Sequence, residues 1–214
     1  LEVARVGGPG YRIFNITSGH TVTIEGLTIR NGQDLSVPPT GGGGAISNQH
    51  STLTVRRCSF VQNTGTIGGA IVNNGGDGGP TATLDVIDST FNGNTSNQRG
   101  AAIYNRGVNG GNAVVRITNS TFSLNDNFGG GFLGILDNDG DTGFADMTVT
   151  NSTLSNNSGR SVVNVGTNGG IGNFTIGNTI MNVTGFSNFL NGLGTITSLG
   201  YNIANDNGGG FLAS

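Results

Sequence analysis

The sequence predicts an all-β fold, a parallel β-solenoid of about seven three-strand coils. An eight-residue pattern recurs about every 31 residues, and apolar and polar residues alternate within it. Glycine is abundant at 41 residues and proline scarce at 4, without a collagen-like period of three. A short three-strand layer cannot bury an apolar face alone, so we expect the layers to stack.

Four positions of the pattern define columns that we expect to lie in register. The first position is apolar and holds Val22, Leu53, Leu84, Val115, Met147, Phe174 and Ile196. Two places on stand Ile24, Val55, Val86, Ile117, Val149, Ile176 and Ser198. Five places on stand Leu27, Cys58, Ser89, Ser120, Ser152, Thr179 and Tyr201. Seven places on stand Ile29, Phe60, Phe91, Phe122, Leu154, Met181 and Ile203. The period of two indicates strands, and the irregular step between the second and third columns indicates a corner. The spacing along each column is nearly constant as far as Met147 and then shortens twice.

A second strand precedes each of these patterns and begins with small residues, as at Gly43–Ile46 and Gly68–Ile71. Two residues after the apolar residue of that strand stands an amide or a carboxylate: Asn48, Asn73, Asn105, Asp137 and Asn164. Stacked side-chain amides satisfy backbone groups at turns. We therefore expect these residues to form a structural ladder at a corner.

Stacking at the roughly 4.8 Å spacing of adjacent strands also predicts a buried aromatic column. Its members are Phe60, Phe91 and Phe122. Opposite charges fall one period apart in three pairs, which should face each other on neighbouring layers: Glu25–Arg56, Arg57–Asp88 and Asp85–Arg116.

Composition narrows the function classes. The net charge is −3, and the nine basic residues are all arginine and dispersed, so no nucleic-acid partner is expected. Cys58 is the only cysteine, and no run is apolar enough for a membrane span. The chain begins without Met and in mid-pattern. We expect one β-helix domain over residues 1–214, cut from a longer polypeptide.

Short motifs recur with the repeat: GGAI at Gly43–Ile46 and Gly68–Ile71, and FxxN at Phe60–Asn63, Phe91–Asn94 and Phe122–Asn125. In these motifs the chain resembles bacterial right-handed parallel β-helix repeat surface proteins, and most closely the repeats of chlamydial polymorphic outer-membrane protein adhesins. The likeness covers roughly residues 12–205. It implies a right-handed coil, an extracellular or cell-surface location and an adhesive role.

Many parallel β-helices are pectate lyases or polygalacturonases, which carry clustered acidic residues on one face. No paired carboxylates recur here on neighbouring layers, and His20 and His50 lack a nucleophile or carboxylate partner in the pattern. We therefore expect no catalytic residues. The acidic run Asp137, Asp139 and Asp141 is a candidate Ca²⁺ site, with a solvated turn as the alternative, and no other cofactor is expected.

These observations favour a non-catalytic extracellular structural or adhesive module, with loops 32–43, 74–81 and 106–112 as candidate contact sites. A polysaccharide-binding or polysaccharide-cleaving β-helix is the alternative. The expected partners are a host or neighbouring cell surface, a glycan, or a second copy. The pattern shows no amphipathic cap near Phe211, so copies could stack head to tail into a filament.

Overall fold

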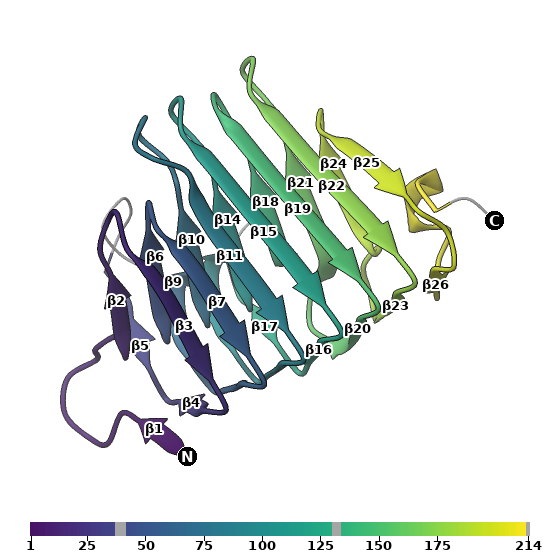
Figure 1. Ribbon diagram of the computed structural model, residues 1–214. Helices are drawn as coiled ribbons and strands as arrows, with labels where there is room; N and C mark the ends of the chain where they lie inside the picture. Colours follow the sequence, from purple (N-terminus) through teal and green to yellow (C-terminus); the bar gives the residue numbers. More distant parts are fainter. Residues whose placement is uncertain (37–41, 130–133, 213–214) are drawn as a thin grey trace.

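The computed structural model describes residues 1–36, 42–129 and 134–212 (Figure 1). Within these ranges the strands form parallel sheets stacked along one axis, and the one helix is the three-residue 3₁₀ segment η1 (Gly208–Gly210). The predicted all-β parallel solenoid is confirmed. The two termini lie at opposite ends of the stack (Figure 1).

Four sheets, which we call A to D, contain the strands. Sheet A holds β1 (Glu2–Ala4), β4 (Thr28–Arg30), β8 (Ser59–Val61), β12 (Thr90–Asn92), β16 (Thr121–Ser123), β20 (Thr153–Asn157), β23 (Ile180–Val183) and β26 (Ile203–Ala204). Sheet B holds β2 (Phe14–Ile16), β6 (Ile46–Gln49), β10 (Ile71–Asn74), β14 (Ile103–Arg106), β18 (Gly134–Asp139), β21 (Arg160–Val165) and β24 (Phe189–Gly192). Sheet C holds β3 (Thr21–Glu25), β7 (Thr52–Arg56), β11 (Ala82–Ile87), β15 (Asn112–Thr118), β19 (Phe144–Thr150), β22 (Ile171–Gly177) and β25 (Thr195–Ser198). Sheet D holds β5 (Gln33–Asp34), β9 (Thr64–Ile67), β13 (Thr95–Arg99) and β17 (Asp126–Asn127).

The chain passes through sheets B, C and A in turn, and the earlier coils add a short strand of sheet D. The predicted seven coils of three strands are therefore wrong, because the solenoid makes about five turns. The sequence prediction counted one coil for each of the seven strands of sheet C. Strands as short as β5 and β17 have no apolar alternation, so the pattern could not reveal the fourth sheet.

The predicted columns lie in register along most of the stack. Leu53 pairs with Leu84, and Leu84 with Val115, in sheet C. Phe60, Phe91 and Phe122 are fully buried, and successive ring centroids are 4.6 Å apart with interplanar angles of 9° and 11°. The predicted core stack is confirmed, and the rings form one continuous face-to-face column inside the solenoid.

Two of the three charge pairs also form. Arg56 lies 3.1 Å from Glu25, and Arg116 lies 3.4 Å from Asp85. The predicted Arg57–Asp88 pair is wrong, because Arg57 contacts the same Glu25 carboxylate. These pairs lie on the solvent side of the sheets and record the register more than they stabilise it.

The same backbone conformation recurs at the corner between sheets C and A. The residue that turns the corner adopts a left-handed conformation, with φ of 52° at Arg57, 51° at Asp88 and 53° at Asn119. The hydroxyl of the next residue then accepts a hydrogen bond from the coil before it, as from Cys58 N–H to Ser89 Oγ at 3.1 Å. The buried Ser and Thr of this column therefore bind successive coils together.

The register prediction fails in the last coil. Ala204, not Ile203, pairs with Met181, while Ile203 pairs with Ile180 on the outer face. One extra residue enters the preceding corner, where Gly200 and Tyr201 both have positive φ, 87° and 57°. The predicted columns are therefore wrong at Tyr201 and Ile203, whose side chains are 90% and 64% exposed.

Candidate functional site

Sheet B has both of its faces buried in the middle of the stack. Every residue of β10, β14 and β18 is buried, whereas β11 of sheet C alternates between buried and half-buried positions. On the outer face of sheet B, Val72 and Tyr104 form a small apolar cluster with Ile67 of β9. Ile67 at the end of β9 therefore covers part of this face, and the polar side chains on the outer face of β14 and β18 are buried.

Glycine allows successive coils to approach closely where the strands of sheet B begin. A Cβ on Gly69 would lie 2.1 Å from the carbonyl oxygen of Ala101 in the next coil, and Gly68 has a φ of 57°. The close approach of successive coils therefore requires the glycines of the GGAI motif.

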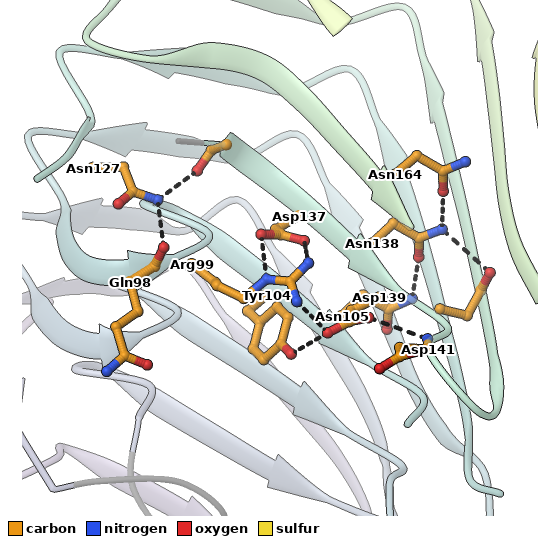
Figure 2. Close-up of polar contacts among 12 residues, drawn as sticks. Gln98, Arg99, Tyr104, Asn105, Asn127, Asp137, Asn138, Asp139, Asp141 and Asn164 are labelled. Atoms are coloured by element: carbon orange, nitrogen blue, oxygen red, sulfur yellow. Dashed lines mark hydrogen bonds and ion pairs between the residues drawn. The ribbon is translucent and has the colours of Figure 1, made fainter. Parts of the chain in front are cut away.

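Four polar side chains meet on the buried outer face of sheet B. Arg99 comes from the end of β13, Tyr104 from β14, and Asp137 and Asp139 from β18 (Figure 2). Tyr104 and Asp137 are register partners, so they lie side by side on the outer face of sheet B. We call these four residues the Arg99 cluster. It joins three successive coils of the solenoid.

The hydrogen bonds of the Arg99 cluster occupy both carboxylates. Arg99 Nε and Nη2 donate to the two oxygens of Asp137 at 2.9 and 2.8 Å, a bidentate pair. Arg99 Nη1 donates to Asp139 Oδ2 at 2.5 Å, and the Tyr104 hydroxyl donates to the same oxygen at 2.6 Å. The backbone N–H of Asp141 donates to Asp139 Oδ1 at 3.1 Å. All four carboxylate oxygens therefore have protein donors.

Burial shifts the titration of these groups. Desolvation raises the pKa of Asp137 to about 6, although the attraction of Arg99 opposes the rise. Desolvation also raises the pKa of Tyr104 well above its usual value. Burial lowers the pKa of Arg99, but the charges of Asp137, Tyr104 and Asp139 and the hydrogen bond to Asp137 together outweigh this effect, and the net shift is upward. Because it is buried, Asp137 therefore retains its proton to higher pH than a solvated carboxyl group does.

The predicted Ca²⁺ ligands do not converge. Asp137 and Asp139 bind Arg99, whereas the Asp141 carboxylate accepts hydrogen bonds from Thr167 at 2.7 Å and Asn168 at 2.8 Å. Across residues 1–36, 42–129 and 134–212, no three His, Cys, Asp or Glu residues are grouped to hold a metal ion. The Arg99 guanidinium occupies the position between the Asp137 and Asp139 carboxylates that a bound cation would need. In this arrangement Asp137, Asp139 and Asp141 therefore do not fit a Ca²⁺ site.

The amide ladder forms with one substitution. Asn48, Asn73 and Asn105 donate from Nδ2 to the next side-chain oxygen at 2.7 to 2.8 Å. The fourth rung is Asn138, not the predicted Asp137, and it donates to Asn164 at 2.8 Å (Figure 2). The prediction slipped by one residue because Leu136 is the register partner of Ile103.

A second amide ladder explains the FxxN motif. Asn63 Nδ2 donates to Asn94 Oδ1 at 2.9 Å, and Asn94 donates to Asn125 at 3.0 Å. Asn125 donates in turn to Asn157 at 3.0 Å. The backbone N–H of Asn63 also donates to Asn94 Oδ1, at 3.1 Å. The sequence showed this asparagine as a motif, and the structure shows that it holds the corner after sheet A.

Sequence periodicity missed Arg99 and Tyr104. Arg99 is 38 and 40 residues from its two carboxylates, and neither separation matches the repeat. The register between β13 and β9 also shifts between Ser96 and Arg99, so Arg99 does not keep the position that the repeat predicts. The signal in the sequence was an arginine immediately before a small-residue strand, which alone identifies no partner.

The remaining candidates lie at the edge between sheets B and C. His20 Nδ1 is 2.8 Å from the Thr17 carbonyl oxygen, and His50 Nδ1 is 2.7 Å from the Pro80 carbonyl oxygen. Both histidines therefore act as polar turn residues. Loops 74–81 and 106–112 also lie at this edge, whereas loop 32–43 falls partly outside the described residues.

No protein-family model, curated protein or solved structure matches the chain. No helix among the described residues is long and apolar enough to span a membrane.

Proposed function

We propose that this chain is a non-catalytic structural or adhesive module, located outside the cell or on its surface. In this proposal a rigid right-handed β-helix displays a row of polar loops. The right-handed coil follows from the general handedness of parallel strand crossovers. The cell-surface role is supported by the motif resemblance and by the polar outer faces of sheets A and C.

The observation that carries the proposal is the row of loops between sheets B and C, visible along one edge of the stack (Figure 1). Asn109 Nδ2 donates to Asp77 Oδ1 at 2.7 Å, and the Asn109 N–H donates to Thr142 Oγ1 at 3.0 Å. Loops from three successive coils are therefore hydrogen-bonded to one another while their side chains stay at the surface. Such a row offers a preorganised polar contact surface for a glycan or a cell surface.

The Arg99 cluster favours a second candidate, a β-helix that binds or cleaves polysaccharides. It places two carboxylates, an arginine and a tyrosine on one outer face. Against catalysis stands the saturation of Asp137 and Asp139 by protein donors, together with side-chain exposures of 0% and 4%. A general acid or base must reach its substrate.

A two-part experiment separates the candidates. The 214-residue chain is incubated with polygalacturonate and with cellulose, and new sugar ends are measured. We expect none. Product release that Asp139→Asn abolishes and Asp85→Asn, at a half-buried surface position, retains would overturn the non-catalytic assignment, provided that circular dichroism shows both variants folded.

The second part measures adhesion. Beads coated with the chain are held under flow on epithelial cells and on cellulose films, with albumin-coated beads for comparison. We expect retention above albumin on at least one surface, and at least tenfold less after Asp77→Ala with Asn109→Ala. Retention equal to albumin on both surfaces would contradict the adhesive role.

Association of copies end to end accompanies the proposal. The strands at each end of the stack, such as β3 and β25 in sheet C, have a neighbour on one side only. Open strand edges are sites for pairing with another chain.

A further inference from the structure

The loops between sheets B and C contain two exposed turns with the same sequence. Asn-Gly-Gly starts at Asn109 in one turn and at Asn168 in the other, with asparagine φ angles of 56° and 54°. Each asparagine and the glycine after it are exposed. Asn109 Nδ2 donates to Asp77 Oδ1 at 2.7 Å, and Asn168 Nδ2 donates to Asp141 Oδ1 at 2.8 Å. In sequence, backbone conformation and side-chain contact the two turns are therefore matched.

The turns differ at the backbone nitrogen of the first glycine. Gly110 N–H donates to the Thr142 carbonyl oxygen of the next coil at 2.8 Å. Among the residues that the structure describes, none accepts a hydrogen bond from Gly169 N–H. The Gly169 nitrogen is therefore held by no part of the described chain, although it lies in the same kind of turn.

A shorter loop in the next coil explains the difference. Asn164 and Asn173, which flank the second turn, are nine positions apart. Their register partners in the next coil, Asn191 and Thr195, are four positions apart. The shorter loop therefore places no carbonyl oxygen opposite the glycine nitrogen.

Most other Asn–Gly pairs resemble the pair at Asn109. The chain contains seven such pairs, and Gly192, of one of them, lies within β24. The pair at Asn168 is the exposed one whose glycine nitrogen has no acceptor in the described chain. In the other five pairs the glycine N–H donates to another residue: Gly32, Gly75, Gly93, Gly110 and Gly208.

We propose that Asn168 is a site of spontaneous deamidation and that it reacts faster than Asn109. The chain holds the side-chain amide close to the nitrogen of the next residue, so the reaction is intramolecular. Glycine has no Cβ to hinder the approach. A hydrogen bond on the attacking nitrogen opposes the reaction, because the N–H must leave its acceptor, lose its proton and turn towards Cγ. Gly110 carries this restraint and Gly169 does not.

Water is the only co-reactant. The Gly169 nitrogen bonds to Asn168 Cγ and gives its proton to water, the Cγ–Nδ2 bond breaks, and Nδ2 takes up a proton and leaves as ammonia. The product is a succinimide ring. Water then adds to one of the two ring carbonyls and opens the ring, which leaves an aspartate or an isoaspartate at position 168.

The reaction changes the row of loops between sheets B and C. The departing nitrogen is the donor to Asp141 Oδ1, so this hydrogen bond between coils is lost. The new carboxylate brings a negative charge beside Asp141, whose remaining side-chain donor is Thr167 Oγ1 at 2.7 Å. Deamidation should therefore loosen the turn and make the chain more acidic.

Peptide mass spectrometry tests the proposal. The folded chain is incubated in mildly alkaline buffer for several weeks, and cleavage after arginine then separates residues 107–116, with Asn109, from residues 161–214, with Asn168. Fragment spectra assign the conversion at each asparagine, and an unincubated sample gives the background. We expect Asn168 to convert about tenfold faster than Asn109, the factor that corresponds to one hydrogen bond of typical strength.

The same incubation in guanidinium chloride controls for sequence, because both turns are then unfolded and should react at similar rates. Ion exchange gives an independent readout. The acidic species that forms from the folded chain should disappear in Asn168→Gln and persist in the matched Asn109→Gln, because the longer glutamine side chain cyclises far more slowly. Equal rates at the two asparagines of the folded chain, no conversion at Asn168, or a difference that persists in guanidinium chloride would overturn the proposal.

Discussion

The central coils, from β6 to β20, and the C-terminal coils, from β21 to η1, use one fold with different sources of stability. In the central coils several columns place like side chains next to each other in successive layers, as in the stack of Phe60, Phe91 and Phe122. In the C-terminal coils the contacts differ from layer to layer, and a plug from beyond the last strand covers the core.

The difference follows from the length of the repeat. The nearly constant period of the central coils keeps equivalent atoms above one another, so amides, hydroxyls and rings each form continuous columns. After Met147 the period shortens, and β25 and β26 contain no buried residue and alternate between exposed and half-buried positions. When the repeat is regular, each coil is stabilised by an equivalent interface with the next coil. When the repeat becomes shorter, these interfaces are no longer equivalent, and a different segment packs on the end of the core.

The largest expected effect breaks the aromatic column. Phe91→Ala should lower the free energy of unfolding by about 3–5 kcal/mol, because the ring is fully buried between two neighbours. Phe189→Ala should cost less, because that ring packs edge-on near the end of the core. Urea denaturation measures both, and equal losses would show that the two regions are packed alike.

The pH dependence of the free energy of unfolding tests the Arg99 cluster. The folded pKa of Asp137 is about 6 against an unfolded value of 3.8. Between these two values the Asp137 carboxyl group holds a proton more tightly in the folded state than in the unfolded state. Its contribution to the free energy of unfolding is therefore complete below pH 3.8 and is lost as pH rises through 6. We expect a decrease of about 3 kcal/mol in the free energy of unfolding across that window.

The matched variant is Asp137→Asn, which keeps an acceptor for Arg99 and cannot ionise. Its urea stability should vary less over the same window, and the difference from the parent chain isolates this group. The raised pKa of Asp146 contributes in the same direction in both proteins. An unchanged pH profile in Asp137→Asn would contradict the assignment.

The amide ladders should matter most where they are continuous. Asn94 is fully buried, and its side chain bonds Asn63, Asn125 and the Phe60 carbonyl oxygen. Asn94→Ala should cost about 2 kcal/mol, because buried groups in both neighbouring coils lose their partners. Asn191→Ala, at the last rung of the other ladder, should cost less. Hydrogen exchange would locate the loss, and uniform opening of the whole stack would speak against this local role.

The surface pairs give a small expected effect. Glu25→Gln removes the contacts with Arg56 and Arg57, whose side chains are 43% and 57% exposed. We expect a loss below about 1 kcal/mol, and a smaller one in high salt. A larger loss in urea denaturation would give these pairs a structural role that their exposure does not suggest.

Calcium should have no effect. Asp137 and Asp139 are held by Arg99 and Asp141 points away from them, so added Ca²⁺ or a chelator should leave the thermal midpoint unchanged. A stabilisation by Ca²⁺ that Asp139→Ala removes would restore the metal site that the sequence suggested.

The sequence predicted the columns because each one is a local signal repeated many times. Phe60, Phe91 and Phe122 are separated by the same offset, and their order in space follows directly. The same reasoning placed Asp137 in the ladder in error, because one added residue near it shifted the strand. The Arg99 cluster was beyond this reasoning, since its members are neither equally spaced nor alike.

The sequence by itself determined the solenoid, its buried rings and its hydroxyl and amide corners, because stacking places chemically equivalent residues in contact at every turn. Only the tertiary structure decided which residues meet across different positions of the repeat. Arg99 at the irregular end of β13 binds Asp137 of β18, and Phe211 packs against Phe189. Such contacts depend on the path of single loops in space, and the periodicity of the sequence does not predict that path.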